Sequence, residues 1–67
     1  MYITLTDKYP TEAGIYICKR PCQVHIEVAV LRKVFSDEKL TFFSGLSIFP
    51  YEQLEEGVLW SEEIIIL

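Results

Sequence analysis

The feature that most constrains this fold is an alternating stretch, VHIEVAVLRKV, at residues 24–34. From residue 24 to residue 30, every second position holds a β-branched aliphatic residue, namely Val24, Ile26, Val28 and Val30. The residues between them are mixed in character, namely His25, Glu27, Ala29 and Leu31. A period of two is typical of a half-buried β-strand, and β-branched side chains suit a pleated surface. We therefore predict a strand over 24–34 whose valine and isoleucine row packs inward and whose mixed row faces solvent.

The flanking segments predict further strands at residues 2–6, 14–20, 40–46 and 58–67. Residues 50–56 indicate one short helical turn, because Pro50 suits a first helical position and Gly57 a left-handed stop. Short connections favour antiparallel pairing, since parallel strands need long crossovers. The chain is predicted to be a single domain over residues 1–67, mainly β with a minor α+β character. Its expected architecture is a five-stranded antiparallel meander curled into a small open barrel, the alternative being a flat sheet with the short helix across one side.

Size and composition predict an exposed apolar surface. The chain has 67 residues, of which 51% are hydrophobic. A domain this small buries only about 60% of the surface that its unfolded chain exposes. Part of the apolar surface must therefore lie outside the core, and such patches tend to be interaction sites.

The stretch CKRPCQVH, residues 18–25, gathers both cysteines and the only histidine. Cys18, Cys22 and His25 offer three potential zinc ligands, whereas a structural zinc site usually has four. A redox pair usually has a C-x-x-C spacing at a helix N-terminus. We interpret the stretch as a tight hairpin with the two cysteines nearly opposite, in preference to a metal site or a redox pair. No metal and no cofactor are expected.

The charge distribution argues against nucleic acid as a partner. Residues 1–39 carry six basic and five acidic residues, whereas residues 40–67 carry five glutamates and no lysine or arginine. The net charge of −4 gains little from neutralising phosphates. His25 and Glu27 could form an acid–base pair, but catalysis also needs a pocket and a polarising group, so we expect no enzyme activity.

The acidic C-terminal half is the predicted docking surface. Trp60, Tyr51 and Phe49 are expected to be aromatic anchors inside a rim of glutamates that steers the chain towards a basic protein surface. The same glutamates could instead serve only to solubilise the run IIIL, residues 64–67. The predicted partner-binding residues are Phe49, Tyr51, Glu55, Glu56, Trp60, Glu62, Glu63 and Ile65.

Location and membrane association follow from what the chain lacks. No apolar run approaches the roughly 20 residues of a membrane-spanning helix, and MYITLTDKYP is unlike a secretory signal. The expectation is a cytoplasmic chain, in the host cytoplasm if phage-encoded, that does not bind membranes and keeps its cysteines reduced.

Two motifs resemble those of short phage and prophage proteins. These open on a Pro…Gly-x-Tyr turn and strand, matched by Pro10, Gly14 and Tyr16 in YPTEAGIYIC. They close on a Trp followed by Glu and Ile, matched by LWSEEI, although proline often follows there and IIIL follows here. The resemblance implies a small β-rich accessory protein and carries over no catalytic residue.

We therefore interpret the chain as a small non-enzymatic protein-binding module. The expected role is that of a phage-encoded inhibitor or modulator that occupies a surface of a host protein. The alternative is a homo-oligomeric structural or assembly component joined through the C-terminal strand.

Overall fold

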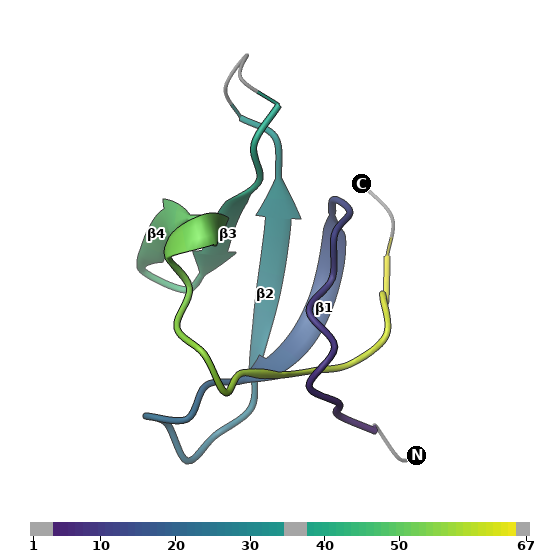
Figure 1. The fold of residues 1–67 in the computed structure, drawn as a ribbon, viewed down its shortest axis with the longest axis vertical. Helices are drawn as coiled ribbons and strands as arrows, with labels where there is room; N and C mark the ends of the chain where they lie inside the picture. The colour runs from purple at the N-terminus through teal and green to yellow at the C-terminus, as the bar shows by residue number, and fades with distance from the viewer. Residues whose placement is uncertain (1–3, 35–37, 66–67) are drawn as a thin grey trace.

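The computed structural model describes residues 4–34 and 38–65 and contains one five-stranded antiparallel sheet (Figure 1). The strands are β1 (Gly14–Lys19), β2 (Glu27–Arg32), β3 (Thr41–Ser44), β4 (Ser47–Pro50) and β5 (Leu59–Trp60). Their order in the sheet is β4-β3-β2-β1-β5, and the one helical element among the described residues is a 3-10 turn, η1 (Tyr51–Gln53). The prediction of a mainly β fold with five antiparallel strands is confirmed. The sheet does not close, because β4 and β5 remain its two edges.

The strand boundaries differ from the prediction at three places. Residues 40–46, expected as one strand, belong to a hairpin in which Ser44 pairs with Ser47 across Gly45 and Leu46. Gly45 has a φ of +58°, which suits the first central position of a two-residue hairpin loop. Residues 20–26 form a loop, so β2 starts only at Glu27. In the expected strand 2–6, Thr6 makes a single bridge to Trp60, and residues 2 and 3 lie outside the described residues.

The last segment also departs from a continuous strand. Cys18 pairs with Trp60, but Ile15 pairs with Ile65, so residues 61–64 contain two more residues than the facing part of β1. Within this bulge the Ser61 hydroxyl accepts a hydrogen bond from the Ile17 N–H at 2.9 Å. The polar side chain thereby replaces a ladder carbonyl, and the segment stays attached to β1. Residues 66 and 67 of the predicted strand lie outside the described residues.

The face of β2 that packs inward is the opposite of the one predicted. Ala29 and Leu31 are fully buried, whereas Val28 is 58% exposed. Tyr16, the cross-strand neighbour of Ala29, is buried on the same side. Because the neighbouring strands supply bulky rings to this side, β2 contributes a small residue where the rings need room. The alternation correctly predicted a strand, but the mixed row faces the core.

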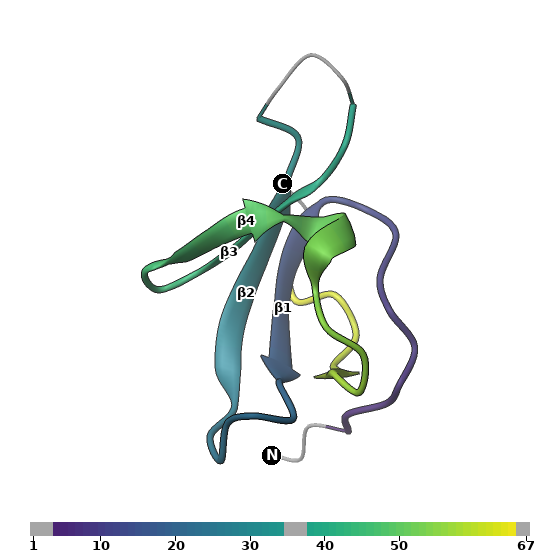
Figure 2. The ribbon, with the colours of Figure 1, turned by 60° about the vertical axis from the view of Figure 1, so that its left-hand side comes forward.

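The core centres on Trp60, which is 1% exposed. Four aromatic rings of the described chain have centroids 5.8 to 6.3 Å from its ring, those of Tyr9, Tyr16, Phe42 and Tyr51. Three of them meet it edge-on, a favourable arrangement for aromatic pairs. Figure 2 shows η1, the segment leading to β5 and the N-terminal segment on the same side of β1 and β2. The core therefore lies between one face of the sheet and these covering segments.

Tyrosine hydroxyls tie the covering segments to the rest of the chain. Tyr51 donates to the carbonyl of Pro10 at 2.7 Å, and Tyr16 donates to the carbonyl of Glu12 at 2.9 Å. The Tyr9 hydroxyl donates to the carbonyl of Glu55 at 2.7 Å and accepts from the N–H of Val58 at 3.0 Å. These bonds satisfy backbone groups that neither helix nor strand would otherwise pair.

Candidate functional site

The predicted aromatic anchors lie in or against the core. Trp60 is almost fully buried, so its ring is not exposed as a docking anchor in this structure. Phe49 and Tyr51 are half-buried and pack against the core cluster, and Phe49 stacks on Phe42 with centroids 4.9 Å apart. Burial raises the pKa of the Tyr51 hydroxyl well above its ordinary value of 10.0. The three rings stabilise the fold and do not form an exposed cluster.

The predicted glutamates are divided between surface and structural positions. Glu55, Glu56 and Glu62 are exposed. Glu63 is half-buried, and its Oε2 lies 3.4 Å from the Tyr16 hydroxyl, next to Gly14. Burial, together with the charge of Glu63, raises the pKa of Tyr16. Glu63 therefore fills a place inside the fold, where a side chain at Gly14 would collide with it.

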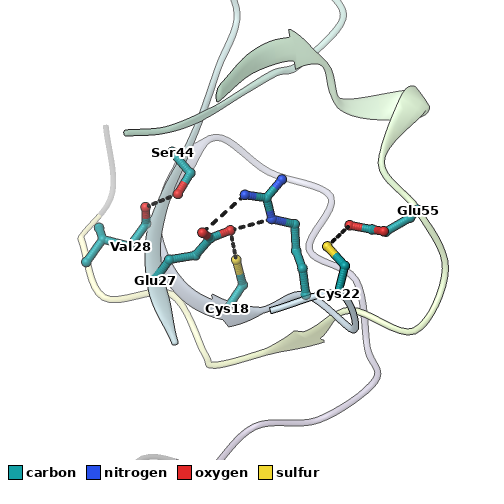
Figure 3. Close-up of polar contacts among 7 residues, drawn as sticks. Cys18, Cys22, Glu27, Val28, Ser44 and Glu55 are labelled. Carbon is teal, nitrogen blue, oxygen red and sulfur yellow. Dashed lines mark hydrogen bonds and ion pairs between the residues drawn. The ribbon is translucent and has the colours of Figure 1, made fainter. Parts of the chain in front are cut away.

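The stretch CKRPCQVH comprises the end of β1 and the loop that follows it, and a polar cluster anchors this loop (Figure 3). Arg20 contacts the Glu27 carboxylate through Nε at 2.7 Å and through its terminal nitrogen at 3.2 Å. With its amide nitrogen turned towards Glu27, Gln23 donates to that carboxylate at 2.8 Å and accepts from Arg20 at 2.7 Å. Burial opposes the charge of Arg20, but the hydrogen bond and charge of Glu27 outweigh it and raise the pKa of Arg20. This cluster explains how Glu27 can occupy an inward position of β2.

The two cysteines have different environments. Cys18 is fully buried opposite Glu27, and burial together with that carboxylate raises the pKa of its thiol to about 12. Cys22 is exposed in the loop, and its sulfur lies 3.7 Å from Glu55 Oε1. Both thiols are free, as expected, and the stretch does connect two antiparallel strands. Cys18 pairs with Glu27 and not with Cys22, because the connection is longer than predicted and runs through residues 20–26, so the expectation that the two cysteines face each other is wrong. Over residues 4–34 and 38–65, His, Cys, Asp and Glu side chains form no group of three that could hold a metal ion.

A cleft of about 630 Å³ lies between the N-terminal segment and the C-terminal bulge. Its walls include Tyr9, Tyr16 and Glu63. The hydroxyls of both tyrosines are bonded to backbone carbonyls or to Glu63, as described above. The two tyrosine hydroxyls and Glu63 are therefore used to hold the fold together.

The opposite side of the sheet carries an exposed row of apolar residues. Ile65, Ile15, Val30, Phe43 and Ile48 pair in succession from one edge of the sheet to the other. Residues directly opposite in antiparallel strands share a face, so these side chains form one continuous row. Ile17 and Val28 form a second, adjacent pair. We define the outer apolar face as Ile15, Ile17, Val28, Val30, Phe43, Ile48 and Ile65.

Exposure distinguishes this face from the core. Val28, Ile48 and Ile65 are 58%, 63% and 53% exposed, and the other members are half-buried. Of the predicted site residues, only Ile65 belongs to it. The signal was present in the sequence as the valine and isoleucine row of 24–34, but that row was assigned to the core. The alternating pattern thus identified the apolar row, but the row lies on the exposed face of the sheet and not in the core.

The charges on this side are of one sign. At the outward positions of the five described strands, the charged residues are Lys19 and Arg32, and both are cationic. Lys19 pairs with Leu59 of β5, and Arg32 pairs with Thr41 of β3. On β2, Glu27 points inward to Arg20. The acidic character of the chain is thus absent from this face of the strands.

Both edges of the sheet are partly blocked. Thr6 and Trp60 exchange backbone hydrogen bonds of 2.8 and 2.7 Å, so the outer edge of β5 is occupied there by the chain itself. At the other edge, β4 ends in Pro50, which has no backbone N–H to donate. Such edges favour recognition through a face over recognition through an added strand.

No protein-family model, curated protein or solved structure matches this chain. Within the described residues, no helix is long and apolar enough to cross a membrane.

Proposed function

We propose that this chain is a non-enzymatic protein-binding module that docks a different protein on its outer apolar face. The observation that carries the proposal is the apolar row Ile65–Ile15–Val30–Phe43–Ile48, which crosses β1 to β4 outside the core and continues to Ile65 through its bridge to β1. Burial of this row by a partner would contribute about 25 cal/mol of favourable free energy for each Å² of apolar surface removed from water. Exposed apolar surfaces of this kind mark interaction sites.

The charges favour a different protein over a second copy. A symmetric pair offers the same surface from both sides, and the outward positions of the described strands in one copy carry no carboxylate that could pair with Lys19 and Arg32 of the other. Like charges facing each other across an interface oppose association. A heterologous partner has no such restriction. A role as a phage-encoded modulator of a host protein remains compatible with this docking mode.

The alternative of assembly through the C-terminal strand has less support. Trp60, which would form the centre of that edge, has its backbone N–H and carbonyl bonded to Thr6. Ile65, which is bridged to Ile15, belongs instead to the outer apolar face. Self-assembly would therefore have to displace the N-terminal segment first.

Site-specific photo-crosslinking in cells tests the proposal. A benzophenone amino acid is placed at residue 48 on the outer apolar face, or at residue 56 in an exposed loop on the acidic segment. The expected result is one discrete product with a different protein from position 48 and none from position 56. Products containing two copies of this chain, or equal yields from both positions, would overturn the proposal.

A matched pair of substitutions keeps this test specific. Val28→Glu adds a charge on the outer apolar face, whereas Val24→Glu makes the same change in the loop, at a residue that is 83% exposed. Both positions are exposed, so both variants should fold. Val28→Glu should abolish the product formed at position 48, and Val24→Glu should leave it. An undiminished product in the Val28→Glu variant would contradict docking on this face.

A further inference from the structure

We infer that the partner surface is apolar and bears carboxylates at two places about 20 Å apart. This inference rests on the proposed function, because it describes what the outer apolar face would recognise. It follows from where the two outward cations lie relative to the apolar rows. Neither composition nor net charge suggests it, since the whole chain is acidic.

Lys19 and Arg32 lie at opposite ends of the outer apolar face. Cys18 pairs with Glu27, so Lys19 is level with Ile26, which precedes Arg32 by six residues. Six residues of strand span about 20 Å at about 3.3 Å each. Arg32 is exposed, and Lys19 is half-buried beside Leu59 of β5. The apolar rows Ile17–Val28 and Ile15–Val30 lie between these two cations.

This arrangement determines both the chemistry of the partner surface and the length over which it must extend. Apolar contact supplies most of the affinity, while charges at the ends set register and exclude surfaces of the wrong sign. Carboxylates at both ends would pair with Lys19 and Arg32, whereas basic residues there would be repelled. A helix of about 13 residues has the required length, at about 1.5 Å per residue.

Two synthetic helical peptides test this directly. Both carry the same leucine and alanine stripe of about 13 residues, and they differ only in having two glutamates or two lysines at each end. The protein as a whole is acidic, so long-range attraction favours the lysine peptide. If Lys19 and Arg32 select the partner, the glutamate peptide binds more tightly by about tenfold at low salt, and the difference shrinks as salt screens the charges.

Charge-reversed variants connect the preference to the two residues. Lys19→Glu with Arg32→Glu should reverse the order of the two peptides. Lys8→Glu with Lys33→Glu changes the net charge equally at exposed positions outside the strands and should keep the original order. Equal or stronger binding of the lysine peptide by the unmodified protein would overturn the inference.

The two proposals fail in different ways. If Val28→Glu weakens both peptides but no preference for the glutamate peptide exists, the docking face stands and the inferred partner chemistry is wrong. If Val28→Glu leaves the binding of both peptides unchanged, the docking face itself is wrong. Binding is measured by fluorescence anisotropy of the labelled peptide, with the unmodified protein as reference.

Discussion

At the scale of single residues, environment and residue type point in different directions. Tryptophan is a residue type typical of interface anchors, but four rings surround Trp60 and it holds the core together. Valine is a residue type typical of protein cores, but Val28 is 58% exposed. In a chain this small, the largest side chain contributes most to the little core available, whereas a valine can be left outside at lower cost.

The Trp60→Ala substitution should therefore behave as a core truncation. We expect it to lower the free energy of unfolding by about 3–5 kcal/mol, since it removes a buried ring and leaves a cavity. Leu59→Ala, at the exposed neighbouring position of β5, should cost far less. Urea unfolding followed by circular dichroism measures both. Equal losses in the two variants would contradict the central place of Trp60.

The two thiols should differ in reactivity and in their effect on stability. Cys22 is exposed and should react at once with a thiol reagent, whereas Cys18 should react only as fast as the fold opens. The Cys18 thiol has a pKa of about 12 in the folded chain against an ordinary 9.0, so the unfolded chain loses this proton first. Stability should therefore fall as the pH rises from 9 towards 12.

Cys18→Ala provides the control for the pH effect. Between pH 9 and 10, below the ordinary tyrosine pKa, the variant should show a shallower loss of stability than the unmodified chain. Two thiols that react equally fast in the folded protein, or identical pH profiles, would show that Cys18 is not buried as described.

At the scale of elements, the chain uses short strands with interruptions between them. The β3–β4 hairpin turns on two residues, and the last segment bulges by two residues between its pairings to β1. The hairpin reverses the chain within two residues, and the bulge bends the last segment. β4 and β5 form the two edges of the sheet, and η1 and the N-terminal segment pack over its inner face.

Gly45 tests the hairpin most simply. Its φ is +58°, and no atom lies within 4 Å of where a side chain would begin, so only backbone strain opposes substitution. Gly45→Ala should cost about 1–2 kcal/mol. Gly45→Asn should cost less, because asparagine tolerates the left-handed region. Thermal unfolding compares the two variants, and an alanine variant as stable as the unmodified chain would contradict this turn.

The predictable part of the fold was its element type and pairing direction. Alternation and short connections predicted antiparallel strands around residues 14–20 and 24–34, and Pro50 predicted the helical turn. The face of β2 could not be predicted from its own pattern, because the choice depends on the rings that β1, β3 and β5 bring to the inner side. The aromatic anchors were assigned to the surface for the same reason. Trp60, Phe49 and Tyr51 pack in or against the core, whereas Val28 and Ile48 remain exposed.

At the scale of the whole molecule, apolar and acidic surfaces are separated. The outward strand positions carry only cations, whereas Glu55 and Glu56 lie in the exposed loop that follows η1. The outer apolar face is therefore accessible to a partner without interference from the acidic loop. Net negative charge keeps such a chain in solution in spite of its apolar surface.

The oligomeric state should reflect this separation. Sedimentation of the purified chain should give a monomer at micromolar concentration, because facing copies would bring Lys19 and Arg32 close to other cations. Added salt should strengthen any residual self-association by screening that repulsion. A stable dimer at low salt that Val28→Glu dissociates would show that a second copy occupies the outer apolar face.

The docking face depends on the orientation of β2, whose valine row faces solvent and whose alanine and leucine row faces the core. Methyl NMR spectra with a soluble paramagnetic agent test it directly, since the agent broadens only methyl signals that it can approach. We expect strong broadening for Val28 and Ile48 and protection for Leu31 and Val58, which are fully buried. Protected Val28 and broadened Leu31 would reverse the sheet and remove the proposed docking face.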